Sequence, residues 1–339
     1  MRHFCTYFDH RYLPQGLALY ESLRRHCGDF CLWVLCLSDS CHRVLDKLAL
    51  EKIRPIALSD LERGDDELLK AKGNRSIVEY YFTCSSSLPL HVFKLQPDVE
   101  MLTYLDSDLW FFSSPEPLFD ELGGNSIGIV SHRFPASLHH MEKNGIYNVG
   151  WLTFRRDERG LACLRWWQER CLEWCYDRHE PGRFADQKYL DDWPERFPGV
   201  AVLQHTGANV APWNLANHPV EENAGGVLVD GQALIFFHFH HLKRLRGWLF
   251  ETALPQYQVK LNGVLKRRVF APYLAALDAQ RRRVQPLLSD DSSGNTIRQN
   301  WLDLDHEWPS VGERVRRSRE FLKDLRSHRK LLYLAGRVC

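Results

Sequence analysis

The sequence lacks any long hydrophobic segment and any recognisable targeting segment. No run approaches the ~18 consecutive apolar residues that a membrane-spanning helix requires, so we expect no membrane span in the 339 residues. The N-terminus passes directly into an expected strand, Phe4–Phe8, without the hydrophobic region and small-residue cleavage site of a signal peptide. These absences predict a cytoplasmic protein.

Paired metal-binding cysteines, internal repeats and nucleic-acid signatures are also missing. The 10 cysteines are spaced irregularly and none forms a CxxC pair, so without a signal peptide we expect reduced thiols. No basic stripe interleaved with aromatic residues is present, so nucleic acid is not an expected partner. No segment recurs at a fixed period, which argues against a solenoid or propeller.

What is present describes a globular chain with an uneven distribution of charge. A hydrophobic fraction of 44% and a charged fraction of 26% suit one large α/β domain with an appendage. The formal net charge is only +1, yet the segment from Leu242 to the end carries about 20 Lys and Arg against about 10 Asp and Glu. We expect a catalytic body over 1–245 and a basic, mainly helical extension over 246–339.

The basic extension has several possible contacts. Ser310–Leu334 alternates Arg-rich and Leu-rich positions and predicts a basic amphipathic helix. Such a helix could rest on the inner face of a membrane, meet an anionic acceptor, pack on the body of the protein or join two copies as a dimer. The stretch Pro286–Asn300 is rich in Ser, Asp and Gly and predicts a linker.

Alternating strands and helices open the chain. Strand-like runs at Phe4–Phe8, Phe30–Leu37 and Ile53–Leu58 are separated by helical patterns, which predicts right-handed βαβ units and a mainly parallel sheet. In such sheets ligands bind beyond the carboxyl ends of the strands. Asp9 and Tyr12 follow the first strand at such an end, so they face a nucleotide or form a plain turn.

A long helical stretch follows over Arg75–Leu95, and we expect an interruption near Pro89. Arg75 could neutralise phosphate, although a solvated helix surface is the commoner place for an arginine. A second amphipathic helix is expected over Leu161–Tyr176, where the aromatic residues indicate core packing.

The stretch Met101–Phe112 reads as a buried strand that two carboxylates interrupt near its carboxyl end. Buried Asp is costly unless it is paired or binds a cation. The i, i+2 spacing of Asp106 and Asp108 turns both side chains the same way if the strand stays extended, whereas a turn at Ser107 would change that. Such a pair suits a hard divalent ion that also carries phosphate oxygens. The alternative is a strand that ends in an Asx turn.

A histidine-rich strand end supplies further candidates. In Leu234–His241, alternation places His238 and His240 on one face. Imidazole is a suitable third ligand for Mn²⁺, and Lys243 and Arg244 directly afterwards suit a diphosphate.

Two further polar pairs interrupt apolar segments. Asn148 and Gly150 lie at the entrance of a strand-like segment, where Gly permits close approach and Asn offers a donor and an acceptor to hydroxyls. Asp186 and Gln187 lie side by side at an expected helix start, where an Asp is often only an N-cap.

Together these motifs resemble GT-A glycosyltransferases, in particular the retaining family 8-type enzymes such as glycogenin and bacterial lipopolysaccharide galactosyltransferases. The Leu-Asp-Ser-Asp strand end, the Tyr-Asn-x-Gly segment, the Asp-Gln pair and the late His with basic neighbours occur in the family's order, over roughly residues 3–245. The family pattern His-x-x-Gly-x-x-Lys is altered here, since His241 replaces Gly and Arg244 replaces Lys.

The resemblance implies a role for each matching residue. Asp106 and Asp108 would bind Mn²⁺ or Mg²⁺, completed by His238 or, alternatively, His240. Asp186 and Gln187 would lie near the anomeric centre. The residues that would contact the nucleotide-diphosphate sugar are Asp9, Tyr12, Arg75, Asp106, Ser107, Asn148, Gly150 and one or both of Lys243 and Arg244.

The expected activity is transfer of a sugar, most simply from a UDP-sugar, to a hydroxyl of a glycan, lipid-linked or small-molecule acceptor. The resemblance implies retention of configuration and a role in bacterial surface polysaccharide or glycosylated metabolite synthesis. Three alternatives remain: an inverting transferase with Asp186 as base, a non-catalytic sugar-nucleotide binding protein, and a glycoside hydrolase with two flanking acids and no nucleotide.

Overall fold

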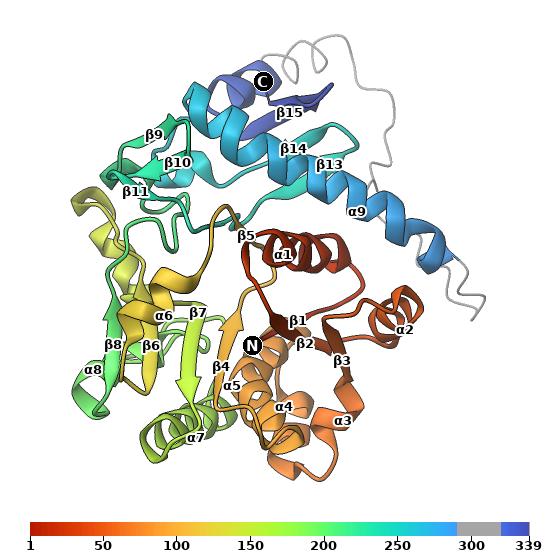
Figure 1. Ribbon diagram of the computed structural model, residues 1–339, viewed down its shortest axis with the longest axis vertical. Coiled ribbons are helices and arrows are strands. Elements are labelled where there is room, and N and C mark those ends of the chain that lie inside the picture. Colours follow the sequence, from red (N-terminus) through yellow and green to blue (C-terminus); the bar gives the residue numbers. More distant parts are fainter. Residues whose placement is uncertain (290–319, 339) are drawn as a thin grey trace.

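The computed structural model describes residues 1–289 and 320–338. A seven-stranded sheet lies at its centre, in the order β3-β2-β1-β4-β7-β6-β8 (Figure 1). β7 runs antiparallel to β4 and β6, and the other neighbouring pairs are parallel. The mainly parallel sheet expected from the sequence is therefore confirmed. The strands are β1 Arg2–Phe8, β2 Phe30–Cys36, β3 Ile53–Ala57, β4 Met101–Leu105, β6 Ile127–Ser131, β7 Tyr147–Arg155 and β8 Val200–Leu203.

Helices cover both faces of this sheet, because strand residues alternate between two separate cores. Phe4 and Phe8 of β1 pack with α1, α2 and α6 on one face, whereas Cys5 packs with α4, α5 and α7 on the other. The helices are α1 Leu13–His26, α2 Asp39–Leu48, α3 Leu58–Glu62, α4 Asp66–Asn74, α5 Ile77–Leu95, α6 Glu116–Leu122, α7 Glu158–Glu173, α8 Trp193–Arg196 and α9 Ala271–Ser289.

The second half of the chain adds small sheets. β5 pairs with β12 outside the central sheet, β9 to β11 form a meander, and β13 to β16 form a four-stranded antiparallel sheet. The strands are β5 Leu109–Phe111, β9 Val220–Asn223, β10 Gly226–Val229, β11 Gln232–Ala233, β12 Phe236–His238, β13 Lys243–Arg246, β14 Leu249–Glu251, β15 Lys330–Leu334 and β16 Arg337–Val338.

The C-terminal residues share a core with the body of the protein. Trp110 and Phe237 pack in one apolar cluster with Phe250, Tyr273 and Leu331, and α9 lies against α1 (Figure 1). The boundary expected at residue 245 falls within β13. This packing holds the extension to the region around β5 and β12.

Two sequence expectations are corrected. Residues 330–334 form β15 and are not helical, because they complete a sheet by pairing with β14. Residues 320–326 are helical, while 310–319 and most of the expected linker lie outside the described residues. α5 continues through Pro89 without a break, since buried Leu88, Val92 and Phe93 hold both sides of it against the core. No helix in the described ranges has the length and apolarity to span a membrane.

Candidate metal centre

The expected single strand over 101–112 is in fact two strands joined by a turn that carries both carboxylates. β4 ends at Leu105 and β5 begins at Leu109. The turn is held by hydrogen bonds from the Asp106 N–H to the Gly150 carbonyl (3.2 Å) and from the Leu109 N–H to the Asp106 carbonyl (3.4 Å). Asp106, Ser107 and Asp108 therefore lie beyond the carboxyl end of β4, where α/β sheets bind ligands.

The strand after this turn brings a distant histidine to the carboxylates. β5 pairs antiparallel with β12, and His238 lies opposite Leu109. Phe239 donates its N–H to the Asp108 carbonyl (3.1 Å), and His238 donates its N–H to the Val210 carbonyl (2.8 Å). The register of this two-stranded sheet thus places the imidazole beside Asp106 and Asp108, which lie about 130 positions earlier in the sequence.

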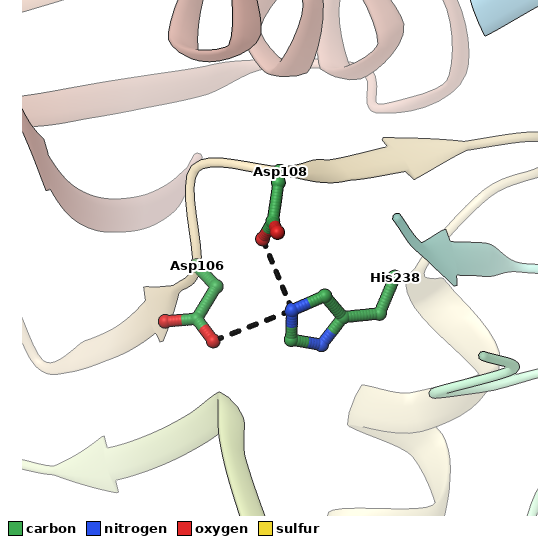
Figure 2. Close-up of side chains that lie close together, drawn as sticks. All are labelled: Asp106, Asp108 and His238. Atoms are coloured by element: carbon green, nitrogen blue, oxygen red, sulfur yellow. Dashed lines mark ion pairs between the residues drawn. The ribbon is translucent and has the colours of Figure 1, made fainter. Parts of the chain in front are cut away.

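Both carboxylates point at the same imidazole nitrogen (Figure 2). Nε2 of His238 is 3.0 Å from Oδ1 of Asp108 and 3.6 Å from Oδ2 of Asp106. One ligand atom from each residue lies within 4.8 Å of the other two, and in the described parts of the chain no other His, Cys, Asp or Glu group of three meets this criterion. The imidazole is 4% exposed and the carboxylates 27% and 23%, so one side of the group is open to a ligand.

The electrostatics of the group favour a cation. Burial and the charge of Asp108 raise the pKa of Asp106, despite the attraction of His238. Burial also opposes ionisation of Asp108, but the charge and hydrogen bond of His238 outweigh it and lower that pKa. Burial lowers the pKa of His238, but the two carboxylates have the larger combined effect. The pKa of His238 is therefore raised above its usual value. Two carboxylate oxygens and one imidazole nitrogen are a donor set that fits Mn²⁺ or Mg²⁺.

A buried tyrosine that sequence analysis did not identify supports Asp106. The hydroxyl of Tyr104 donates to Oδ1 of Asp106 (2.9 Å), which leaves Oδ2 facing His238. Tyr104 is fully enclosed beside Tyr7, and burial raises the pKa of both phenols well above the usual value. The signal in the sequence was that Tyr104, near the end of β4, precedes Asp106 by two residues, the spacing that turns two side chains to the same side of an extended chain.

Gly150 allows β7 to approach the imidazole. A Cβ atom at this position would lie 2.6 Å from Oδ1 of Asn148 and 3.0 Å from Nδ1 of His238. Nδ1 of His238 is buried and has no hydrogen-bond partner in the described residues. The absence of a Cβ at Gly150 therefore leaves room for the His238 imidazole and the Asn148 amide. This is a close approach of the kind predicted from the sequence.

The amide groups of Asn148 and Gln187 form one hydrogen-bonded chain. Asn148 accepts from the Gly150 N–H (3.0 Å) and its amide nitrogen contacts Oε1 of Gln187 (3.1 Å) and Nε2 of His132 (3.2 Å). Gln187 donates in turn to the Asn144 carbonyl (3.0 Å). The structure thus joins two residues predicted separately and adds His132, whose pKa burial lowers to about 3.

Asp186 is a buried carboxylic acid on the α5 side of the site. It is not an N-cap: Ser85 of α5 donates its hydroxyl to Oδ2 of Asp186 (2.6 Å), and Trp167 donates to its backbone carbonyl (2.8 Å). Burial, reinforced by the charge of Asp106, raises the pKa of Asp186 to about 7, although the Ser85 hydrogen bond opposes the change. Asp186 is therefore poised to exchange a proton near neutral pH.

Asp9 and Tyr12 begin the loop after β1. The buried Asp9 carboxylate accepts from the Arg11 and Tyr12 backbone N–H groups (2.9 and 3.2 Å) and pairs with the Arg11 guanidinium (2.7 Å). The pKa of the Tyr12 phenol is raised, first because the phenol is partly buried and second because of the charge of Asp108. The residue as a whole is 47% exposed. This loop lies at the same end of the sheet as Asp106, Asp108 and His238, which together are called the metal group.

The structure does not bring Arg75 to the metal group. Its guanidinium donates to the carbonyl oxygens of Cys171 (2.7 Å) and Leu172 (2.6 Å) near the end of α7 and to the Thr83 hydroxyl. Arginine at a helix C-terminus satisfies carbonyls that have no helical partner. Arg75 therefore links the end of α7 to α5 through these hydrogen bonds.

The basic residues after β12 separate in space. Arg244 donates from Nη1 and Nη2 to Oδ1 of Asp278 on α9 (both 3.1 Å), whereas Lys243 is exposed. His240, the alternative ligand, lies outside the metal group. Its ring packs edge-on against Trp213 at a centroid distance of 5.3 Å, and the ring of His238 contacts the same Trp213 at 5.0 Å. His238 is thus the histidine that the fold places at the carboxylates.

The sequence resembles two known bacterial proteins. No model of a known protein family matches the sequence. Two proteins of Bacillus subtilis (strain 168), both described as uncharacterized, are similar: YfnD is 30% identical over 295 residues, which cover 86% of this chain and 94% of YfnD. YfnF is 36% identical over 244 residues, which cover 70% of this chain and 80% of YfnF. The chain belongs to the YfnD and YfnF family.

The fold of this YfnD and YfnF family member is that of the GT-A glycosyltransferases. It is similar to the galactosyltransferase LgtC, solved in complex with donor and acceptor sugar analogues, with a TM-score of 0.52 and 16% identity. The similarity covers 84% of this chain and 99% of LgtC. The GT-A fold expected from the sequence motifs is confirmed.

Proposed function

We propose that this YfnD and YfnF family member is a metal-dependent glycosyltransferase that moves a sugar from a nucleotide-diphosphate sugar, most simply a UDP-sugar, to an acceptor hydroxyl. The observation that carries the proposal is the Asp106–Asp108–His238 group beyond the carboxyl end of β4 in a GT-A fold. The binding of donor and acceptor sugar analogues by LgtC supports the same substrate classes here.

In this proposal Asp106, Asp108 and His238 hold Mn²⁺ or Mg²⁺. When bound, the ion neutralises charge on the departing diphosphate. Asp9, Tyr12 and Ser107 contact the nucleotide part of the donor, and Asn148 contacts the sugar. Gly150 leaves the room that the imidazole and the Asn148 amide need. Asp186 and Gln187 position the sugar near the anomeric carbon, with retention of configuration, in the synthesis of a bacterial surface glycan or glycosylated metabolite.

One observation favours a second reaction on the same fold. Asp186 has a pKa raised to about 7, close to the value that suits a general base at neutral pH. An inverting transferase would use this carboxylate to deprotonate the acceptor hydroxyl. Proton NMR of the anomeric centre in the first product distinguishes the two reactions.

A thermal-shift panel tests the proposal. UDP-, GDP- and TDP-sugars are each added with Mn²⁺ and with EDTA, because a ligand that binds the native state raises the melting temperature. We expect one nucleotide class to raise it only with Mn²⁺, and the Asp106→Asn variant to lose this response while it melts cooperatively. Full metal-dependent donor cleavage by Asp106→Asn would reject the assigned role.

A further inference from the structure

The imidazole of His238 lacks the hydrogen bond that usually orients a metal-binding histidine. Such a histidine binds through one ring nitrogen and donates the other N–H to a carboxylate or a carbonyl, which fixes the ring. Nδ1 of His238 is buried and has no partner of this kind in the described parts of the chain. The placement of Nε2 beside Asp106 and Asp108 is therefore set by the groups that pack around the ring.

Two groups pack against this ring without a hydrogen bond to it. Gly150 of β7 lies along one edge, where an added Cβ would be 3.0 Å from Nδ1 and 3.2 Å from Cε1 of His238. The indole of Trp213 lies nearly perpendicular to the imidazole, with a centroid distance of 5.0 Å and an interplanar angle of 78°. Gly150 contributes only backbone, so Trp213 is the side chain of this pair that restrains the ring.

Trp213 belongs to a loop between β8 and β9 that is itself firmly held. The residue is 3% exposed, and the next residue, Asn214, is completely buried. The Asn214 amide nitrogen donates to the His132 carbonyl (3.0 Å), which joins the loop to the end of β6. The same loop is joined to β12, because the His238 N–H donates to the Val210 carbonyl (2.8 Å). The indole therefore has a fixed place relative to the backbone of His238.

The indole contacts its neighbours through its rings and not through its N–H. His132 and His240 also lie edge-on to Trp213, at centroid distances of 5.1 Å and 5.3 Å. Nε1 of Trp213 is buried and has no hydrogen-bond partner within the ranges that the structure describes. Any effect of Trp213 on His238 is therefore one of ring size and shape, which a smaller side chain would remove.

We propose that Trp213 is a positioning residue of the metal group, whose indole holds the His238 imidazole with Nε2 toward the two carboxylates. This inference rests on the proposed function. Packing against the indole replaces the hydrogen bond that Nδ1 lacks. Loss of the indole frees the imidazole to rotate about its side-chain bonds, so it should weaken metal binding although all three ligands remain.

The test compares Trp213→Leu and Trp213→Phe with a matched control, Trp193→Leu. Trp193 is fully buried, and its Nε1 likewise has no partner among the described residues. It also packs edge-on against two rings, those of Phe154 (5.8 Å) and Trp167 (5.7 Å), but in a different apolar cluster from Trp213. Both leucine variants lose an indole from a packed interior, so both should melt earlier than the unaltered chain.

Calorimetric titration of Mn²⁺ into the full chain gives the first readout. We expect Trp213→Leu to raise the Kd for Mn²⁺ about tenfold or more, the usual effect of losing a group that orients a metal ligand. Trp213→Phe keeps an aromatic ring at this place and should raise the Kd less. Trp193→Leu should bind Mn²⁺ like the unaltered chain.

Pulsed electron paramagnetic resonance at saturating Mn²⁺ gives a second readout that a loss of stability alone would not change. An imidazole nitrogen bound to Mn²⁺ modulates the electron spin echo, and His238→Ala should abolish this nitrogen signal. We expect Trp213→Leu to weaken the signal and Trp193→Leu to leave it unaltered.

The outcomes separate this inference from the proposed function. An unaltered Mn²⁺ affinity and an unaltered nitrogen signal in a folded Trp213→Leu variant would overturn the inference and leave the proposed function intact. If Trp213→Leu does not fold, the same two results in Trp213→Phe would overturn it. If the unaltered chain itself binds no Mn²⁺, the proposed metal site fails.

Discussion

Removal of one buried hydroxyl should weaken metal binding without a large change in the fold. In Tyr104→Phe, Asp106 loses its 2.9 Å hydrogen bond from the Tyr104 phenol. A hydrogen bond to a charged group is worth about 1.5–3 kcal/mol. The Asp106 side chain is 27% exposed, so water replaces part of this interaction. We therefore expect the loss in binding free energy to lie at the lower end of this range, which raises the Kd for Mn²⁺ about tenfold.

The assay is calorimetric titration of Mn²⁺ into the full chain at neutral pH. Tyr80→Phe is the matched control, because Tyr80 is equally buried and donates to another carboxylate, that of Glu62, at 2.8 Å. We expect Tyr80→Phe to lose stability but to bind Mn²⁺ normally. Equal Mn²⁺ affinities in both variants would show that the Tyr104 hydroxyl does not position Asp106.

Two further predictions concern the same region. Gly150→Ala should weaken Mn²⁺ binding about tenfold or more, because its Cβ would lie 3.0 Å from Nδ1 of His238; Gly124→Ala, with no atom within 4 Å, is the control, and normal binding by Gly150→Ala would contradict the role of this contact. The Asp186 pKa is raised to about 7, so the folded state holds this proton more tightly than the unfolded state. The free energy of unfolding should therefore fall as pH rises from about 4 to about 7, by at most about 4 kcal/mol, and Asp186→Asn should flatten this slope in urea titrations. Identical slopes in both proteins would refute the assignment.

Local patterns were sufficient for the central sheet and for the two carboxylates of the metal group. Alternation and apolar runs predicted the strands around Phe4–Phe8 and Phe30–Leu37, since both are buried on two faces. Asp106 and Asp108 stood out because carboxylates in an apolar strand need a partner. The choice between His238 and His240 needed the pairing of β12 with β5, which joins segments more than 120 residues apart.

Other features depend on tertiary contacts that no local pattern contains. Pro89 predicts a break in an isolated helix, yet packing keeps α5 continuous. Lys243 and Arg244 are equivalent in sequence, and only Asp278 on α9 distinguishes them. Arg75 likewise has the chemistry of a phosphate ligand, but the carbonyls at the end of α7 occupy its guanidinium.

The pairing of β12 with β5 has a consequence for the order in which the protein is made. A ribosome that has reached residue 203 has synthesised all seven strands of the central sheet, together with Asp106 and Asp108. The third member of the group, His238, belongs to β12, which follows only at residues 236–238. A nascent chain can therefore build its sheet before it can complete the metal group. A complete Asp106–Asp108–His238 group thus marks a chain whose second half has already folded back onto the first.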